Sequence, residues 1–115
     1  RKWSKGEYAP IEKVYHFPGT DYTSGISVAT PLIKGIQGNI WTERIHTPQR
    51  LQFMVYPRLS ALAEAAWTQD HSKNYENFNL RMDKMLEIYK KYGIVFFNYK
   101  DPESSPEVAG PEKRK

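Results

Sequence analysis

A tryptophan and a glutamate two positions apart, Trp41 and Glu43, are the residues of this chain best suited to chemistry on a sugar. An indole face covers the apolar C–H surface of a pyranose, and a carboxylate accepts hydrogen bonds from its hydroxyl groups. Residues two apart on a strand point to the same side, here at the end of the strand. The spacing also fits a core tryptophan beside a surface glutamate, which is the more common arrangement because large aromatics usually serve packing.

Other kinds of site have little support in the sequence. The three histidines lack the helical i, i+4 spacing of metal ligands: His16, His46 and His71. His46 is close enough to Trp41 and Glu43 to line the mouth of a pocket, but we favour an ordinary loop histidine. No serine has a nucleophile-elbow context, and no glycine loop has the lysine and helix start of a phosphate site. We therefore expect no metal and no cofactor.

The composition is that of a globular protein without disulfides. Of the 115 residues, 39% are hydrophobic and 14% aromatic, too many for a disordered polymer, and there is no cysteine. The net charge is +4, of which Lys113, Arg114 and Lys115 contribute +3, so the body is nearly neutral. A neutral body argues against a nucleic-acid partner, and no apolar run is long enough for a membrane span.

The first part of the chain is rich in proline and glycine, which predicts a loop-rich entry with a turn or two of helix at residues 11–15. Residues 33–41 then alternate in polarity, which predicts a strand with Ile36, Gly38 and Ile40 on one side. The two glycines of this segment indicate close backbone approach to a neighbour. We expect the strand to belong to a larger sheet.

Two helices are predicted after this strand. Thr47 and Pro48 start the first, and its apolar stripe runs to Trp67 with a kink or break near Tyr56, because Pro57 removes a backbone donor. Asn74 caps the second, which ends at Gly93 after an apolar face at helical spacing. That face comprises Tyr75, Phe78, Met82, Met85, Leu86, Tyr89 and Tyr92. Residues 94–99 should dock as an extended tail, and residues 101–115 should be disordered.

Two motifs at residues 35–43 (GIQGNIWTE) and 56–67 (YPRLSALAEAAW) resemble the family-20 glycoside hydrolases, the β-N-acetylhexosaminidases. Residues 12–15 and 81–94 support the resemblance, which covers roughly residues 8 to 99. It implies that residues 1–100 form the last strand, last helix and closing helix of a (β/α)8 TIM barrel. A barrel needs roughly 200 residues or more, so we expect a piece of a longer protein, mainly α with a short strand.

The resemblance also implies roles for single residues. In the family, the residue matching Trp41 lines the floor of the sugar pocket, and the residue matching Glu43 hydrogen-bonds the hydroxyls of the terminal sugar. The matches to Arg58, Glu64 and Trp67 are structural. The implied partner is an N-acetylhexosamine-terminated glycan, cleaved by an exo-acting, substrate-assisted retaining hydrolysis. A secreted, periplasmic or lysosomal location is likewise implied only by the resemblance.

The family's catalytic Asp-Glu pair is missing, because no aspartate in this sequence is followed by glutamate. We therefore expect no catalytic residue in this chain and no activity from it alone. An exposed strand edge and apolar helix stripe should make it self-associate. Two alternatives stay open: a non-catalytic carbohydrate-binding or protein-interaction module that uses Trp41 and Glu43, and a structural helical piece without a ligand.

Overall fold

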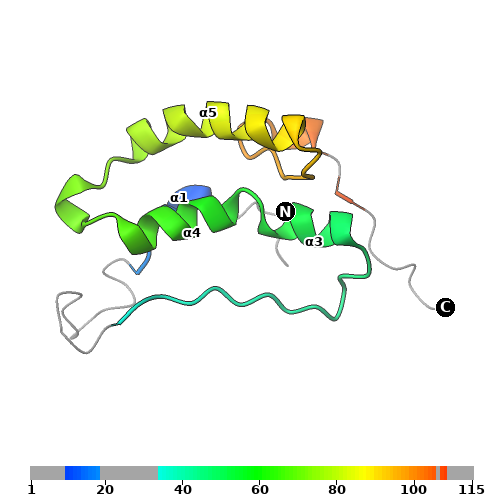
Figure 1. Ribbon diagram of the computed structural model, residues 1–115, viewed down its shortest axis with the longest axis horizontal. Helices are drawn as coiled ribbons and strands as arrows, with labels where there is room; N and C mark the ends of the chain where they lie inside the picture. Colours follow the sequence, from blue (N-terminus) through cyan, green and yellow to red (C-terminus); the bar gives the residue numbers. More distant parts are fainter. Residues whose placement is uncertain (1–9, 19–33, 106, 109–115) are drawn as a thin grey trace.

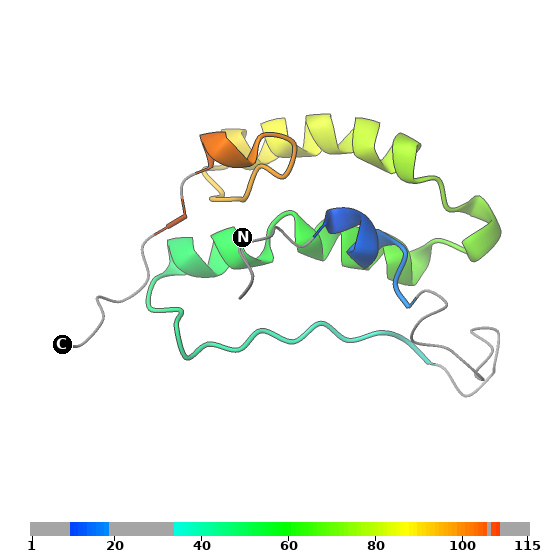
Figure 2. The ribbon, with the colours of Figure 1, turned by 180° about the vertical axis from the view of Figure 1, so that it is seen from behind.

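The computed structural model describes residues 10–18, 34–105 and 107–108, which are arranged in three levels (Figure 1). A long helix, α5 (Tyr75–Lys91), lies above a broken pair, α3 (Pro48–Val55) and α4 (Arg58–Trp67). The extended segment of residues 34–42 runs beneath this pair. The short helix α1 (Ile11–Tyr15) packs against α4 (Figure 2). In the part of the chain described, no helix is both long and apolar enough to cross a membrane.

The break between α3 and α4 lies where the sequence predicts it. The Thr47 hydroxyl accepts a hydrogen bond from the Arg50 N–H at 3.1 Å, which caps α3. Tyr56 is extended, with φ −95° and ψ 139°, and α4 begins after Pro57. Because the helix stops there, the Tyr56 carbonyl is free to accept a hydrogen bond from the Phe97 N–H at 3.1 Å. The predicted interruption therefore creates a docking point for the segment after α5.

Helix α5 begins and ends as predicted. The Asn74 side chain accepts from the Asn77 N–H at 2.8 Å, and Gly93 adopts a left-handed φ of 66°. The Ile94 N–H donates to the Tyr89 carbonyl at 2.9 Å, as in a Schellman ending. Tyr92, the last residue of the predicted apolar face, is 71% exposed. The apolar face of this helix therefore does not reach the core at its C-terminal end.

The core is one cluster between α1, α4 and α5. Tyr15 is completely buried, its ring lies 4.9 Å from that of Phe78, and its hydroxyl accepts from the Asn74 N–H at 2.7 Å. Ala61 is also completely buried, which lets α1 approach α4 closely, as the alanine-rich sequence of this helix predicts. The cluster comprises Ile11, Tyr15, Ala61, Phe78, Met82, Leu86 and Tyr89.

The segment that follows α5 docks as an extended tail, as predicted. The Val95 N–H donates to the Gln52 side chain at 2.9 Å, and Phe97 is buried against Phe53 with ring centroids 5.8 Å apart. These contacts return the chain to α3. They tie the first half of the broken helix to the segment that follows α5.

The predicted strand at residues 33–41 is wrong for the part that the structure describes. Residues 34–42 are extended, but they pair with no strand among the described residues, and Ile33 lies outside these. A strand exists only through hydrogen bonds to a neighbour, so alternation in one segment cannot make one. The fold is therefore mainly helical, as expected, without the short strand in its described part. The place of this unit in a barrel stays a prediction.

The buried Arg50 of α3 holds the beginning of the C-terminal segment. Its guanidinium donates to the Glu107 carboxylate at 2.9 Å and to the Val108 carbonyl at 2.5 Å. Residues Pro102–Ser104 form a 310 turn before this contact. Of residues 101–115, for which disorder is predicted, residues 106 and 109–115 lie outside the described residues, as does most of the predicted loop-rich entry.

Alkaline pH should destabilise this fold through three tyrosines. Burial raises the pKa of Tyr75, Tyr89 and Tyr99 above the ordinary tyrosine value. A raised folded-state pKa leaves stability intact below the unfolded pKa of about 10 and removes it as pH rises from there towards the folded value. Urea unfolding from about pH 9 to about pH 11 should show this loss.

The matched variants are Tyr99→Phe and Tyr92→Phe. Tyr99→Phe removes a hydrogen bond to Asn79 at 2.5 Å, which should cost about 1 kcal/mol at neutral pH, but it should flatten the alkaline slope. Tyr92 is 71% exposed, and its replacement should leave the slope unchanged. An equal slope in all three proteins would show that tyrosine burial does not cause the loss.

Candidate functional site

The two predicted sugar-binding residues lie where the extended segment turns into a helix. The Ile45 N–H donates to the Thr42 carbonyl at 2.9 Å, which closes a turn with Glu43 and Arg44 at its centre. Trp41 directly precedes this turn. The connection to α3 is short, so the helix returns antiparallel along the segment, as Figure 1 shows. This arrangement is a strand-like segment followed by its helix, with the candidate residues at the carboxyl end of the segment.

Both candidate side chains are open to solvent. Trp41 is 78% exposed, and Glu43 and His46 are also exposed. Within residues 10–18, 34–105 and 107–108, neither the Trp41 indole nor the Glu43 carboxylate makes a hydrogen bond or ion pair. Glu43 lies in the turn rather than in the extended segment, so the alternation that predicted a shared direction for Trp41 and Glu43 does not extend to it. The structure thus brings the two residues to one end of the unit without fixing them to each other.

Gly38 sets the distance between the extended segment and α4. A Cβ atom added at Gly38 would lie 2.6 Å from the Leu62 Cδ2, closer than side chains approach one another. The exposed side chains of Gln37 and Asn39, on either side of Gly38 in the sequence, hydrogen-bond to each other at 2.6 Å. The close approach predicted from the glycines is therefore confirmed at Gly38, whereas Gly35 has no neighbour within 4 Å of such an atom.

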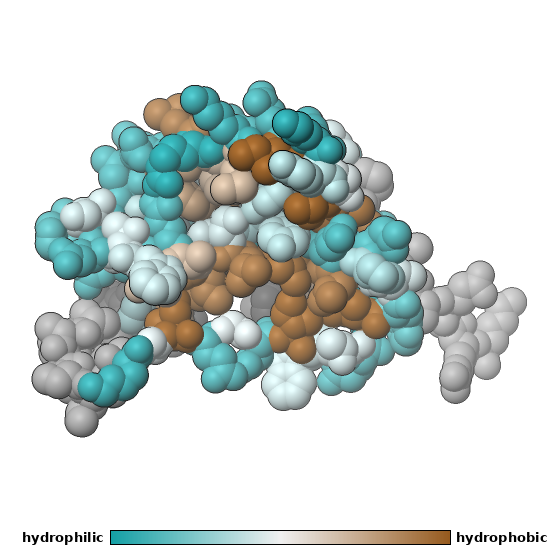
Figure 3. All heavy atoms as spheres, in the orientation of Figure 1, coloured by the Kyte–Doolittle hydropathy of each residue, from teal (hydrophilic) through white to brown (hydrophobic). Residues whose placement is uncertain are grey.

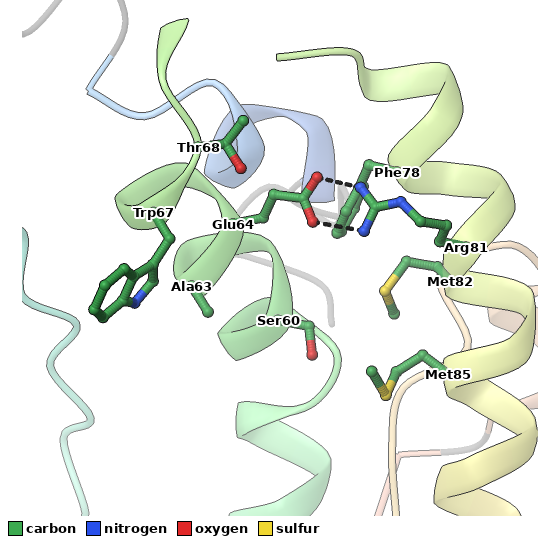
Figure 4. Close-up of a pocket in the computed structure, with 9 residues that line it drawn as sticks. All are labelled: Ser60, Ala63, Glu64, Trp67, Thr68, Phe78, Arg81, Met82 and Met85. Carbon is green, nitrogen blue, oxygen red and sulfur yellow. Dashed lines mark hydrogen bonds and ion pairs between the residues drawn. The ribbon is translucent and has the colours of Figure 1, made fainter. Parts of the chain in front are cut away.

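A separate groove of about 350 Å3 opens between α4 and α5 (Figure 4). Its floor is formed by Phe78 and Met82, which belong to the core, and Met85 stands at its side. Trp67 extends from α4 away from Arg81 and is 89% exposed. The full lining comprises Ser60, Ala63, Glu64, Trp67, Thr68, Phe78, Arg81, Met82 and Met85.

An ion pair between Glu64 and Arg81 closes the groove on one side. The Arg81 guanidinium donates to both carboxylate oxygens, with Nη1 at 2.9 Å from Oε2 and Nη2 in contact with Oε1. Its Nε donates to the Asn77 side chain at 2.8 Å. The hydrogen bond to Glu64 raises the pKa of Arg81 above its already high value, so this side chain stays charged. The pair joins α4 to α5, which fits the structural role expected for Glu64.

The groove and the Trp41–Glu43 turn are not one site. The extended segment lies on the side of α3–α4 that is opposite α5, whereas the groove lies between α4 and α5 (Figures 1 and 4). The groove residues were not predicted as a site, because Glu64 and Arg81 are far apart in sequence and carry no shared motif. Among the described residues, no three His, Cys, Asp or Glu side chains are grouped to hold a metal ion.

Comparison with known proteins relates the chain to enzymes that act on sugars. Residues 1–70 match the catalytic domain of glycosyl hydrolase family 20. A beta-hexosaminidase of Porphyromonas gingivalis is 33% identical over 96 residues, which cover 79% of this chain and 12% of the relative. A beta-N-acetylhexosaminidase of Cellulomonas fimi is 29% identical over 77 residues, 67% of this chain and 14% of the relative. No solved structure matches the chain.

These similarities place the chain in the class of the glycosidases, which are hydrolases. The family match covers more than half of the residues, so the chain belongs to glycosyl hydrolase family 20, and the resemblance inferred from its two motifs is confirmed. The chain spans only 12% to 14% of the length of these two relatives. The activity of the whole protein and the roles of Trp41 and Glu43 are therefore matters for proposal.

The Glu64–Arg81 pair should contribute measurably to stability. The Glu64 side chain is 18% exposed and that of Arg81 54%, so we expect a coupling of about 1 kcal/mol, the upper end for exposed pairs. A double-mutant cycle with Glu64→Gln and Arg81→Met, followed by urea unfolding, measures it. The coupling should shrink in about 1 M salt. A coupling near zero at low salt would mean that this ion pair does not help to hold α4 and α5 together.

Proposed function

We propose that this chain supplies the end of the catalytic domain of an exo-acting β-N-acetylhexosaminidase, in which Trp41 and Glu43 hold the terminal N-acetylhexosamine. One observation carries the proposal. Both residues lie at the carboxyl end of an extended segment that turns directly into a helix packed back upon it. In a (β/α)8 barrel, sites form at the carboxyl ends of the strands, in the loops that lead to the helices.

The backbone of the extended segment supports this placement. The peptide groups of residues 34–42 find no hydrogen-bond partner in other described segments, whereas backbone groups inside a folded domain are normally paired. The segment keeps its extended shape, and its Gly38 lies close against Leu62 of α4. These are the properties of a sheet strand whose neighbours belong to other parts of a domain. The relatives, of which this chain matches a small share, have room for those neighbours.

The chemistry assigned to this chain is binding rather than bond cleavage. An indole face against the sugar ring and a carboxylate on its hydroxyls fix the terminal residue of a glycan, which favours cleavage from the chain end. The substrate-assisted reaction also needs a proton donor and a carboxylate that orients the acetamido group. No Asp-Glu pair for these tasks occurs in the sequence, so we assign both to the rest of the protein.

Hydrolysis of a chromogenic N-acetylglucosaminide by the full-length protein tests the proposal. We expect activity in the full-length protein and none in the 115-residue chain. Glu43→Ala should lower kcat/KM about 100-fold to 1000-fold, because charged hydrogen bonds to the sugar are worth several kcal/mol in total. The control is Glu87→Ala, an exposed glutamate of α5, which should leave kcat/KM unchanged. If Glu43→Ala and Glu87→Ala had the same kcat/KM, Glu43 would not be part of the sugar-binding site.

A non-catalytic carbohydrate-binding module is the second candidate, favoured by the 78% exposure of Trp41 in the chain itself. It requires the isolated chain to bind N-acetylglucosamine in calorimetry. The binding should disappear in Trp41→Ala but persist in Trp67→Ala, which removes the 89% exposed indole of helix α4. The hexosaminidase proposal instead expects no detectable heat, because one ring face and one carboxylate form only part of a pocket.

A further inference from the structure

Arg50 of α3 is a charged residue in an apolar part of the fold. Figure 3 shows apolar side chains gathered over α3 and α4, yet Arg50 is only 7% exposed. Among the described residues, it is the one charged residue that is buried. Burying a charge costs free energy that an ion pair repays only in part. The position of Arg50 is therefore better explained by the geometry that it fixes than by a gain in stability.

The two ends of Arg50 hold different parts of the chain. Its backbone N–H donates to the Thr47 hydroxyl at 3.1 Å, and the turn with Glu43 at its centre closes two residues before Thr47. Its guanidinium donates to the Glu107 carboxylate at 2.9 Å and to the Val108 carbonyl at 2.5 Å. Arg50 thus joins the start of α3 to the segment that follows α5.

The segment that follows α5 forms a strap along α3, which comprises residues 94–105 and 107–108. Its Phe97 ring is buried against that of Phe53, and the Phe97 N–H donates to the Tyr56 carbonyl at 3.1 Å, where α3 ends. Arg50 lies in the first turn of α3. The strap is therefore fastened to both ends of this helix, and Arg50 makes the fastening at the end that follows the Glu43 turn.

We propose that Arg50 is a positioning residue for the sugar site, because it holds the turn with Glu43 by clamping the start of α3 to the strap. This inference rests on the proposed function, in which Glu43 binds the terminal sugar. The connection from the turn to Thr47 is short, so the turn follows the first turn of α3. Arg50 acts through Glu43 and not on the sugar itself.

An arginine suits this task better than a lysine does. The guanidinium presents its N–H donors in a planar, fixed fork, which reaches the Glu107 carboxylate and the Val108 carbonyl together. Its Nε has no hydrogen-bond partner among the described residues, so the two terminal nitrogens make the clamp. A lysine ammonium keeps the charge but lacks the fork. Arg50→Lys should therefore retain only part of the positioning.

Hydrogen exchange of the full-length protein, measured by mass spectrometry, tests the clamp without reference to activity. In Arg50→Met, peptides over residues 42–47 should exchange about tenfold faster, because the Ile45 N–H is released when the turn opens. Glu107→Ala breaks the same clamp from its exposed side and should accelerate the same peptides. The control, Arg81→Met, breaks an arginine–glutamate pair between α4 and α5 and should leave them unchanged. No acceleration in the two clamp variants, or equal acceleration in Arg81→Met, overturns the proposal.

A kinetic cycle in the full-length protein shows whether Arg50 acts through Glu43. Arg50→Met should lower kcat/KM for the chromogenic N-acetylglucosaminide about tenfold, mainly through KM, and Arg50→Lys should lower it less. Most of this loss should disappear in a Glu43→Ala background, because the positioned group is gone. An equal loss in both backgrounds would overturn the positioning role. If Glu43→Ala alone had no effect, the proposed function would fail, whereas the exchange experiment would still show whether Arg50 holds the turn.

Discussion

The hydroxyl and ring of Tyr15 hold together two segments that are far apart in the sequence, α1 and the start of α5. Helix α1 has only five residues, too few to be stable alone, so it depends on packing. Its Tyr15 ring is buried against Phe78, and its hydroxyl accepts from the Asn74 N–H, one of the donors that the start of α5 leaves without a helical partner. The same contact therefore satisfies a buried polar group and fixes where α5 begins.

The position of the candidate sugar site follows from this core through α4. Ala61 packs beneath α1, while its neighbour Leu62 turns to the other side of the helix and meets Gly38. The extended segment thus lies at the closest distance that a residue without a side chain allows. The turn with Glu43 is then set by the short connection to Thr47, which caps α3. Core packing and one glycine contact together place Trp41 and Glu43.

Local signals in the sequence predicted the helices, but not the interactions between segments. The caps at Thr47 and Asn74, the stop at Gly93 and the break before Pro57 depend on a few adjacent residues, and all were predicted correctly. A strand depends on a partner that alternation does not identify, so the one at residues 33–41 was predicted wrongly. The groove with its Glu64–Arg81 pair was not predicted either, because it depends on contacts between residues that are far apart in the sequence. For the candidate site, residue types indicated sugar chemistry, but the turn at Glu43 was not foreseen.

The exposure of the extended segment bears on how the proposed sugar site at Trp41 and Glu43 would be formed. Fixing a tryptophan and a glutamate around a sugar costs about 0.5 to 1.5 kcal/mol of side-chain entropy for each residue. Neighbouring strands lower that cost, because they hold the backbone and confine the rotamers before the ligand arrives. Without such neighbours, water satisfies the peptide groups and both side chains remain mobile. On the proposed function, a complete sheet around residues 34–42 would therefore be a condition for tight sugar binding at Trp41 and Glu43.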